Sequence, residues 1–307
     1  LHPLDQTRSP GGSSSGSAVS VATGMAFGSV GTDTGGSVRI PSAACGLVGL
    51  KPTFGEISCD GVVPLAPSLD HVGPLTRCVE DARILYETMR DVLYAPVRET
   101  VPVRRTLGCP KPFFLDRLDD DIRTVFEQAL TRLRSVGWTI RDTAVPHAHY
   151  SPVVCLHLVL SEAAATHTHG LTERADHYTD GVRLRLELGR YVMGEDYARA
   201  QHGRHILGHA IDATLGTYDA LILPTLTIPA PRLATTTVNI GGESEPLRNT
   251  MLRLTQLFNA TGHPAVSLPC GLTAEELPCG LQLIGRRNHT DHLLDVAGAV
   301  EAALSDE

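Results

Sequence analysis

Two glycine- and serine-rich stretches near the start of the chain hold the side chains best suited to chemistry. They read GGSSSGS at Gly11–Ser17 and GTDTGGSVR at Gly31–Arg39. Consecutive glycines let neighbouring main-chain N–H groups converge on one point, which creates an anion-binding site. A serine at the end of such a turn is placed to attack a carbonyl carbon, while the N–H groups hold the oxyanion that forms. The second stretch therefore predicts a serine nucleophile with its own oxyanion hole.

Other interpretations of the same letters are weaker. GSSSG at Gly12–Gly16 matches the nucleophile-elbow pattern with Ser14 at its centre, but the buried strand that must precede an elbow is missing from TRSPG. A flexible linker is disfavoured because apolar residues interleave the block, among them Val19, Met25 and Val30. No phosphate-binding G-x-x-x-x-G-K-[ST] occurs. For either stretch alone, a plain turn that caps a helix stays an alternative.

The elements that must position these residues alternate along the chain. Helical periodicity predicts helices at 16–26 (with Ser15 as N-cap), 78–93, 119–136, 153–168, 196–215, 247–261 and 291–304. Short apolar runs predict strands at 27–30, 46–50, 105–109, 138–140, 219–223, 265–269 and 277–284, with a long loop at 225–246. This alternation predicts an α/β fold with a mixed, twisted central sheet and helices on both faces. We expect one domain over 1–307, in which about 112–216 forms a mostly helical, variable layer.

Composition narrows the class of protein. The chain has 307 residues and a formal charge of −8, and no basic run suggests direct nucleic-acid binding. No apolar run is long enough to predict a membrane span. The seven cysteines are scattered and none forms CxxC, a pattern typical of reduced thiols in a cytoplasmic protein.

The fourteen histidines raise the question of a metal site. His205 and His209 have helical spacing, but the glutamate of an HExxH zinc motif is absent. We therefore expect no metal and no other cofactor. Cys45 and Cys270 have no paired histidine nearby in sequence and are interpreted as small buried residues.

Taken together, the motifs resemble those of the amidase signature family of serine hydrolases. The resemblance rests on SPGGSSSGSAVSVATG, GTDTGGSVRIPSAACGLVGLKPT and GVVPLAPSLDHVGPLTR, and later on GEDYARAQ, YDALILPT, FNATGHPAVSLPCG and LPCGLQLIGRR. It covers almost the whole chain except about 100–190.

The resemblance implies a Ser–cis-Ser–Lys triad that cleaves a carboxylic amide through an acyl-enzyme. By motif, Ser37 matches the nucleophile and Ser13 matches the bridging serine, joined to the preceding glycine by a cis peptide bond. The oxyanion hole corresponds to the main-chain N–H groups of Thr34, Gly35, Gly36 and Ser37. Asp33 and Arg39 match a supporting ion pair, for which a purely bracing role is the preferred interpretation. Asp70 and Asn259 are expected to brace loops, with substrate contact as the alternative for Asp70.

The lysine of the triad has no counterpart here. The chain contains only Lys51, which the resemblance makes structural, and Lys111, outside any motif. The chain starts at Leu1 without a signal-peptide pattern. We therefore expect an N-terminally truncated member of the family, inactive or nearly so by itself.

Three functions fit this resemblance. The first is a stand-alone amidohydrolase acting on a small-molecule amide, with a homodimer as the assembly common among relatives. The second is the glutaminase subunit of a tRNA-dependent amidotransferase, although FGEISCDGVVPLAPSLDHVG is closer to stand-alone amidases. The third is a catalytically dead binding module. The identity of the amide is not readable from the sequence.

Overall fold

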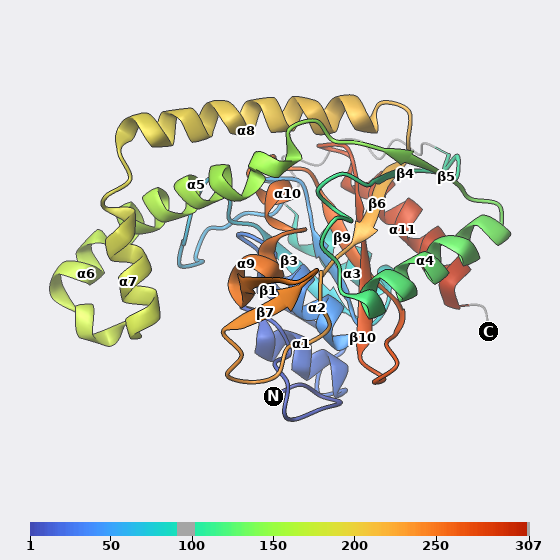
Figure 1. Ribbon diagram of the computed structural model, residues 1–307, viewed down its shortest axis with the longest axis horizontal. Helices are drawn as coiled ribbons and strands as arrows, with labels where there is room; N and C mark the ends of the chain where they lie inside the picture. The colour runs from blue at the N-terminus through green and yellow to red at the C-terminus, as the bar shows by residue number, and fades with distance from the viewer. Residues whose placement is uncertain (91–101, 306–307) are drawn as a thin grey trace.

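The computed structural model describes residues 1–90 and 102–305, and one eight-stranded sheet forms its centre (Figure 1). The strands are β1 (Gly28–Thr32), β2 (Val48–Lys51), β3 (Val72–Thr76), β4 (Thr106–Pro110), β5 (Thr139–Thr143), β6 (Ala220–Pro224), β9 (Ala265–Leu272) and β10 (Pro278–Ile284). They lie in the order β1-β3-β2-β9-β10-β6-β4-β5. β4 runs parallel to β5 and β6, whereas the other pairs are antiparallel. The predicted α/β fold with a mixed sheet is therefore confirmed.

Helices cover both faces of the sheet. The described helices of eight or more residues are α1 (Ser15–Ala22), α3 (Val79–Met89), α4 (Asp120–Ser135), α5 (Ser151–Thr166), α7 (Asp180–Gly189), α8 (Gly194–Leu215) and α11 (Thr290–Ser305). Shorter ones are α2 (Arg39–Cys45), α6 (Thr168–Glu173), α9 (Leu247–Leu252) and α10 (Gln256–Ala260), with single 3-10 turns at Ala148–Tyr150 and Ala175–His177.

Alternate residues of β6 belong to different cores. Ala220 and Ile222 pack with apolar side chains of α3, α4 and α11. Leu221 and Leu223 pack with those of α5, α8 and α10. Because successive side chains of a strand point to opposite faces, this alternation assigns the two helical layers to opposite sides of the sheet. The expected helices on both faces are present.

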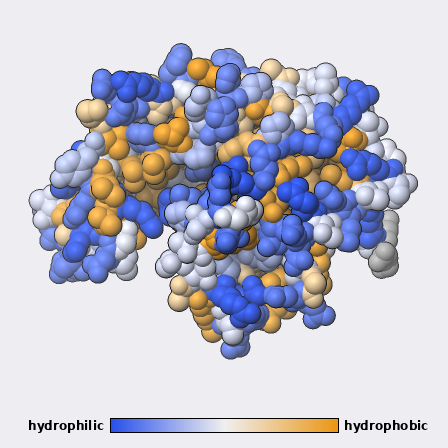
Figure 2. Space-filling view, viewed as in Figure 1, coloured by the Kyte–Doolittle hydropathy of each residue, from blue (hydrophilic) through white to orange (hydrophobic). Residues whose placement is uncertain are grey.

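The helical part between 112 and 216 extends beyond the sheet. In Figure 1, α5 and α8 run across the top of the molecule, and α6 and α7 lie at its left end. Figure 2 shows a notch in the outline between that end and the body, with apolar residues along its upper wall. The single-domain organisation over 1–307 stays a prediction.

Two buried elements near the site escaped sequence analysis. All seven residues of α2 are buried, so this helix has no polar face and shows no amphipathic period. β3 carries Pro74, which normally argues against a strand. β3 pairs with β2 only through Leu75 and Thr76, so that proline takes no part in the β2 pairing.

Several predicted bounds are corrected. The first helix begins at Ser15 and ends at Ala22, not at 16 and 26, and its N-cap residue is Ser14. The helix expected at 78–93 spans Val79–Met89, and the predicted positions 91–93 lie outside the described residues. The expected loop 225–246 contains a hairpin, β7 (Thr237–Ile240) with β8 (Glu243–Pro246). The helix expected at 247–261 is interrupted between α9 and α10.

Among the described residues, no helix is both long and apolar enough to span a membrane.

Candidate functional site

The first serine-rich stretch enters α1 through a cis peptide bond between Gly12 and Ser13, as the family resemblance implied. Gly11 has a φ of +78°, and a Cβ at this position would lie 3.0 Å from an α-carbon of α2. Glycine therefore permits both the backbone conformation and the close approach. The main-chain N–H of Ser14 donates to the carbonyl of Ser37 over 3.2 Å. This bond joins the two serine-containing stretches.

The second stretch forms the turn between β1 and α2. Gly36 has a φ of +140°, and a Cβ there would overlap the hydroxyl of Thr255. Within residues 1–90 and 102–305, no acceptor is found for the main-chain N–H groups of Thr34, Gly35, Gly36 and Ser37. Successive unpaired donors beside a serine hydroxyl form an arrangement that suits a developing oxyanion.

A fully buried ion pair supports this turn. Arg39 donates from Nη2 to Asp33 Oδ1 over 3.0 Å and from Nε to Oδ2 over 3.1 Å. Asn259 donates to both Oδ1 and the main-chain carbonyl of Asp33, each over 2.7 Å. Burial alone would raise the pKa of Asp33, but the Arg39 guanidinium holds this pKa well below its usual range. The expected ion pair is thus present, and Asn259 braces the loop as predicted.

Thr255, at the break between α9 and α10, also bonds to the segment that carries the turn. The Thr255 hydroxyl donates to the carbonyl of Gly35 over 2.6 Å, and the Thr255 carbonyl accepts from Arg39 Nη1 over 3.1 Å. The same carbonyl also accepts from the main-chain N–H of Phe258 over 3.2 Å, so it bonds both to Arg39 and to the first turn of α10. Sequence analysis missed Thr255, because nothing in the local pattern distinguishes it from an ordinary helical threonine.

Asp70 restrains the same turn from the opposite side. Its Oδ1 accepts from the Thr34 hydroxyl over 2.5 Å. Its Oδ2 accepts from the N–H groups of Leu65 and Ala66 over 2.8 and 3.0 Å. The bracing interpretation of Asp70 is therefore the one that the hydrogen bonds support.

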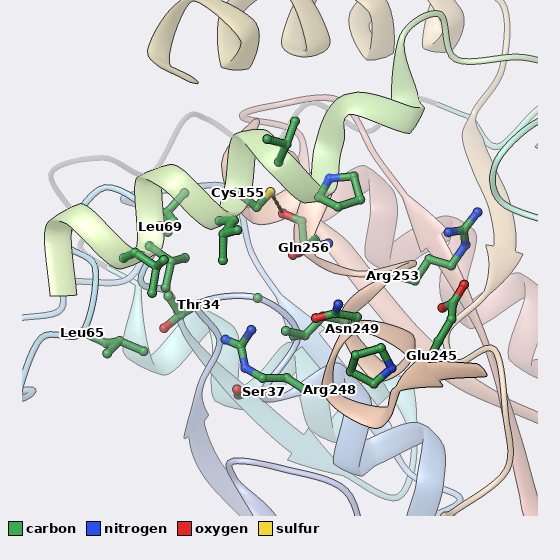
Figure 3. A pocket seen from close by; sticks show the side chains of 18 residues that line it. Thr34, Ser37, Leu65, Leu69, Cys155, Glu245, Arg248, Asn249, Arg253 and Gln256 are labelled. Carbon is green, nitrogen blue, oxygen red and sulfur yellow. Dashed lines mark hydrogen bonds between the residues drawn. The ribbon is translucent and has the colours of Figure 1, made fainter. Parts of the chain in front are cut away.

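Ser13 and Ser37 line one cavity. Its larger part has a volume of about 800 Å³ and contains both serines. An adjoining part of about 490 Å³ contains Thr34, Gly35 and again Ser37. Figure 3 shows this second part, where Thr34 and Ser37 lie below α5 and the Arg248 side chain extends toward them. The turn with free N–H groups thus opens into a space large enough for a small molecule.

The two hydroxyls are not hydrogen-bonded to each other. Across the described residues, neither Ser13 Oγ nor Ser37 Oγ has a hydrogen-bond partner. Ser13 is exposed and Ser37 is half-buried. Contact between these oxygens, on which a relay depends, therefore stays a prediction.

Both lysines lie away from this cavity. Lys51 is fully buried, donates from Nζ to the carbonyl of His263 over 2.6 Å, and lies 3.3 Å from His71 Nε2. Burial lowers the pKa of Lys51 well below its usual value. Lys111 is exposed and pairs with Asp142 over 2.6 Å. The described part of the chain thus supplies no lysine to the two serines.

The cysteines and histidines are the other candidate groups. All seven cysteines are free. Cys45 is buried as predicted, and burial raises the pKa of its thiol to about 12. Cys270 is only partly buried, which corrects the expectation for it. Among the described residues, no three His, Cys, Asp or Glu side chains are grouped to hold a metal ion, His205 and His209 included.

Comparison with known proteins decides the family. A family model described as Amidase matches residues 1–294. The chain belongs to the amidase family. It is 39% identical over 291 residues to an amidase from Pseudomonas putida, in an alignment that covers 90% of this chain and 62% of that protein. A crystal structure of an amidase superposes with a TM-score of 0.92 and 35% identity, covering 99% of this chain and 69% of that one.

This family member also resembles amidotransferase subunits. It is 33% identical over 347 residues to a glutamyl-tRNA(Gln) amidotransferase subunit from Koribacter versatilis (strain Ellin345), covering 99% of this chain and 70% of that protein. The chain thus spans 62% to 70% of the length of these relatives. The family and the relatives called amidase place it among hydrolases that act on amide C–N bonds.

Proposed function

We propose that this chain carries the nucleophile, the bridging serine and the oxyanion hole of an amide hydrolase. One observation carries the proposal: the turn Thr34–Ser37 has unpaired main-chain N–H groups and opens into the cavity that Ser13 also lines. Asp33 and Arg39 are positioning residues, because they hold this turn and do not line the cavity.

In the proposed reaction, Ser37 Oγ attacks the carbonyl carbon of the amide. Its proton passes through the Ser13 hydroxyl to a base, while the N–H groups of Thr34–Ser37 stabilise the oxyanion. Collapse of the tetrahedral intermediate breaks the C–N bond, and the nitrogen leaves as ammonia or an amine after accepting a proton. Water then attacks the ester on Ser37 and releases the acid.

The base in this mechanism is a lysine that these residues do not supply. Lys51 and Lys111 are engaged elsewhere, so neither lysine of the chain is placed to accept a proton from Ser13. We therefore expect the 307 residues alone to turn over amides very slowly. Removing one member of a catalytic unit lowers the rate by about a thousandfold or more.

The test joins this chain to the part of the Pseudomonas putida amidase that has no counterpart in it, giving a fused protein. Ammonia release from hexanamide is then measured for the chain alone, the fused protein, and the fused protein with Ser37→Ala. We expect the fused protein to be faster than the chain alone, and Ser37→Ala to lower its rate by about a thousandfold.

Ser135→Ala in the fused protein is the matched control, because this exposed serine lies on α4, outside the cavity. It should leave the rate unchanged. A Ser37→Ala variant as active as the unmodified fused protein would refute the proposal. Rapid turnover by the chain alone would contradict the expectation that these residues lack the catalytic base.

A glutaminase subunit is the second candidate, and the relatives named as glutamyl-tRNA(Gln) amidotransferase subunits favour it. A glutaminase subunit should release ammonia faster from glutamine than from hexanamide. Partner subunits should increase the rate with glutamine. The third candidate, an inactive binding module, predicts that the fused protein releases no ammonia from either amide, although the chain still binds ligands.

A further inference from the structure

A second cavity, of about 760 Å³, is formed by α8, the segment after α10 and the loop that joins β10 to α11. α8 is the long helix along the top of Figure 1. Among the described residues, none lines both this cavity and the one that Ser13 and Ser37 share. The second cavity is therefore a separate site, to which the proposed function gives no role.

The charges around this cavity are mostly positive. Arg204, Arg286 and Arg287 line it together with a single carboxylate, that of Asp212. Asp212 Oδ2 already pairs with Arg287, and Asp212 Oδ1 accepts from His263 Nε2 over 3.0 Å. The whole chain has a formal charge of −8, so three arginines around one carboxylate run against its overall balance.

Arg204 and Arg286 are half-buried, and main-chain carbonyls hold them in place. Arg204 donates to the carbonyl of Ser68 over 2.8 Å, and Arg286 donates to those of Leu215 and Tyr218 over 2.7 and 2.8 Å. Within residues 1–90 and 102–305, neither arginine forms an ion pair. Burial lowers the pKa of both guanidinium groups, the direction expected for cations that leave water. Their positions are thus fixed, while no carboxylate in direct contact neutralises their charge.

Three exposed histidines, His205, His209 and His289, also line the cavity. In the described part of the chain, their ring nitrogens have no hydrogen-bond partner. Each ring donates an N–H and becomes positive when it takes up a second proton. The same part of the chain holds no group of three His, Cys, Asp or Glu side chains suited to a metal ion. These donors therefore suit an anion better than a cation.

We propose that this cavity binds a diphosphate group, either free or as part of a nucleotide. Arg204 lies on α8, whereas Arg286, Arg287 and His289 lie on the loop before α11. A carboxylate has two acceptor oxygens on one side, whereas a diphosphate has acceptor oxygens on both of its phosphates and can meet donors from two elements. Guanidinium groups bind such oxygens through charge-assisted hydrogen bonds. Phe54, an exposed aromatic residue of the same lining, could stack against the base of a nucleotide.

The test is isothermal titration calorimetry of the 307-residue chain with pyrophosphate, ADP and adenosine, without divalent cations and in about 0.1 M salt. We expect pyrophosphate and ADP to bind one site per chain, and adenosine to bind at least tenfold more weakly than either. Raising the salt concentration should weaken the binding of both anions. Tighter binding of ADP than of pyrophosphate would assign the site to a nucleotide, and equal or weaker binding would assign it to free diphosphate.

Variants connect the binding to the cavity. Arg287→Gln should weaken the binding of pyrophosphate about three- to tenfold, because this arginine is partly exposed to water. His289→Gln, which breaks no side-chain hydrogen bond between the described residues, should weaken it as well and serves if Arg287→Gln does not fold. Asp212→Asn should strengthen binding, since it removes the negative charge while its amide oxygen still accepts from His263. A loss of structure would not strengthen it.

Two controls complete the experiment. Arg199→Gln removes the same charge from an exposed part of α8 outside the lining, and should change the dissociation constant less than twofold. Ser37→Ala should leave it unchanged, because Ser37 lies in the other cavity.

Several results would overturn the inference. They are no measurable binding of pyrophosphate, equal weakening by Arg199→Gln and Arg287→Gln, unchanged binding in both Arg287→Gln and His289→Gln, or a loss of binding in Ser37→Ala. Since the titrations involve no amide, their failure would leave the proposed hydrolysis untouched.

Discussion

The Thr34 hydroxyl donates to Asp70 Oδ1 over 2.5 Å, which joins the turn before Ser37 to the segment that leads into β3. Asp70 holds one edge of the turn, and the Thr255 hydroxyl holds the other through the carbonyl of Gly35. The orientation of the unpaired N–H groups therefore depends on residues distant in sequence. A loop that binds an oxyanion must already be held in its binding conformation before the reaction, since reorganisation of the loop during the reaction costs free energy.

Asp70→Ala should lower kcat of the fused protein about tenfold to a hundredfold, because it frees Thr34 and loosens the turn. The KM should change less, since the contact stabilises the oxyanion site more than the substrate. Steady-state ammonia release gives both constants. Asp60→Ala is the control, because that aspartate is exposed and lies on the same connection. An unchanged kcat for Asp70→Ala would contradict this role.

Gly36→Ala should destabilise the protein by about 1–3 kcal/mol, since the added methyl group overlaps the Thr255 hydroxyl and the φ of +140° suits glycine. Urea unfolding followed by circular dichroism measures the change. Gly16→Ala is the matched control: it lies in α1 and a Cβ there meets no atom within 4 Å. It should leave stability unchanged or raise it by up to about 1 kcal/mol. Equal effects of the two substitutions would contradict the crowding at Gly36.

Asp33→Asn should cost about 3–5 kcal/mol of unfolding free energy, because it leaves the buried Arg39 guanidinium without its anion. The pKa of Asp33 is depressed in the folded state. Its contribution is therefore fully present above the unfolded pKa of about 3.9 and is lost as the pH falls toward the folded value. Asp142→Asn breaks the exposed pair with Lys111 and should have no measurable effect. Denaturant titrations at several acidic pH values measure the unfolding free energy of the unmodified protein and of both variants. If stability fell with decreasing pH to the same extent with and without Asp33→Asn, the role given to Asp33 would be contradicted.

Lys51→Met should flatten the rise of stability with pH. The folded protein holds Lys51 with a lowered pKa, so the unfolded chain binds more protons until the pH passes the unfolded pKa of about 10.4. The unmodified protein therefore gains up to about 1.4 kcal/mol per pH unit from this group, above its folded pKa. The two proteins are compared at each pH, because both carry the same histidines and thiols, whose titration largely cancels from the difference in slope. Parallel slopes for both proteins would show that Lys51 is charged in the folded state.

Much of the fold could be predicted because its signals are local. α4 shows a regular apolar stripe from Ile122 to Leu133, and β6 is a short apolar run ended by Pro224. α2 and β3 gave no such signal, since one is buried on every side and the other contains a proline. The helix expected at 247–261 is interrupted before Gln256. At the break, Thr255 bonds to Gly35 and Arg39, contacts that no local pattern contains.

The sequence by itself determined the serine-bearing turns and the family, because glycines at fixed spacing specify backbone conformations that few other residues adopt. It also restricted the lysines to two, Lys51 and Lys111. Only the tertiary structure decided what holds the turn and what surrounds it. Asp70, Thr255 and Asn259 reach the turn from distant parts of the sequence, and Ser13 and Ser37 line one cavity. Such contacts depend on chain packing over long sequence distances, which single-residue preferences do not encode.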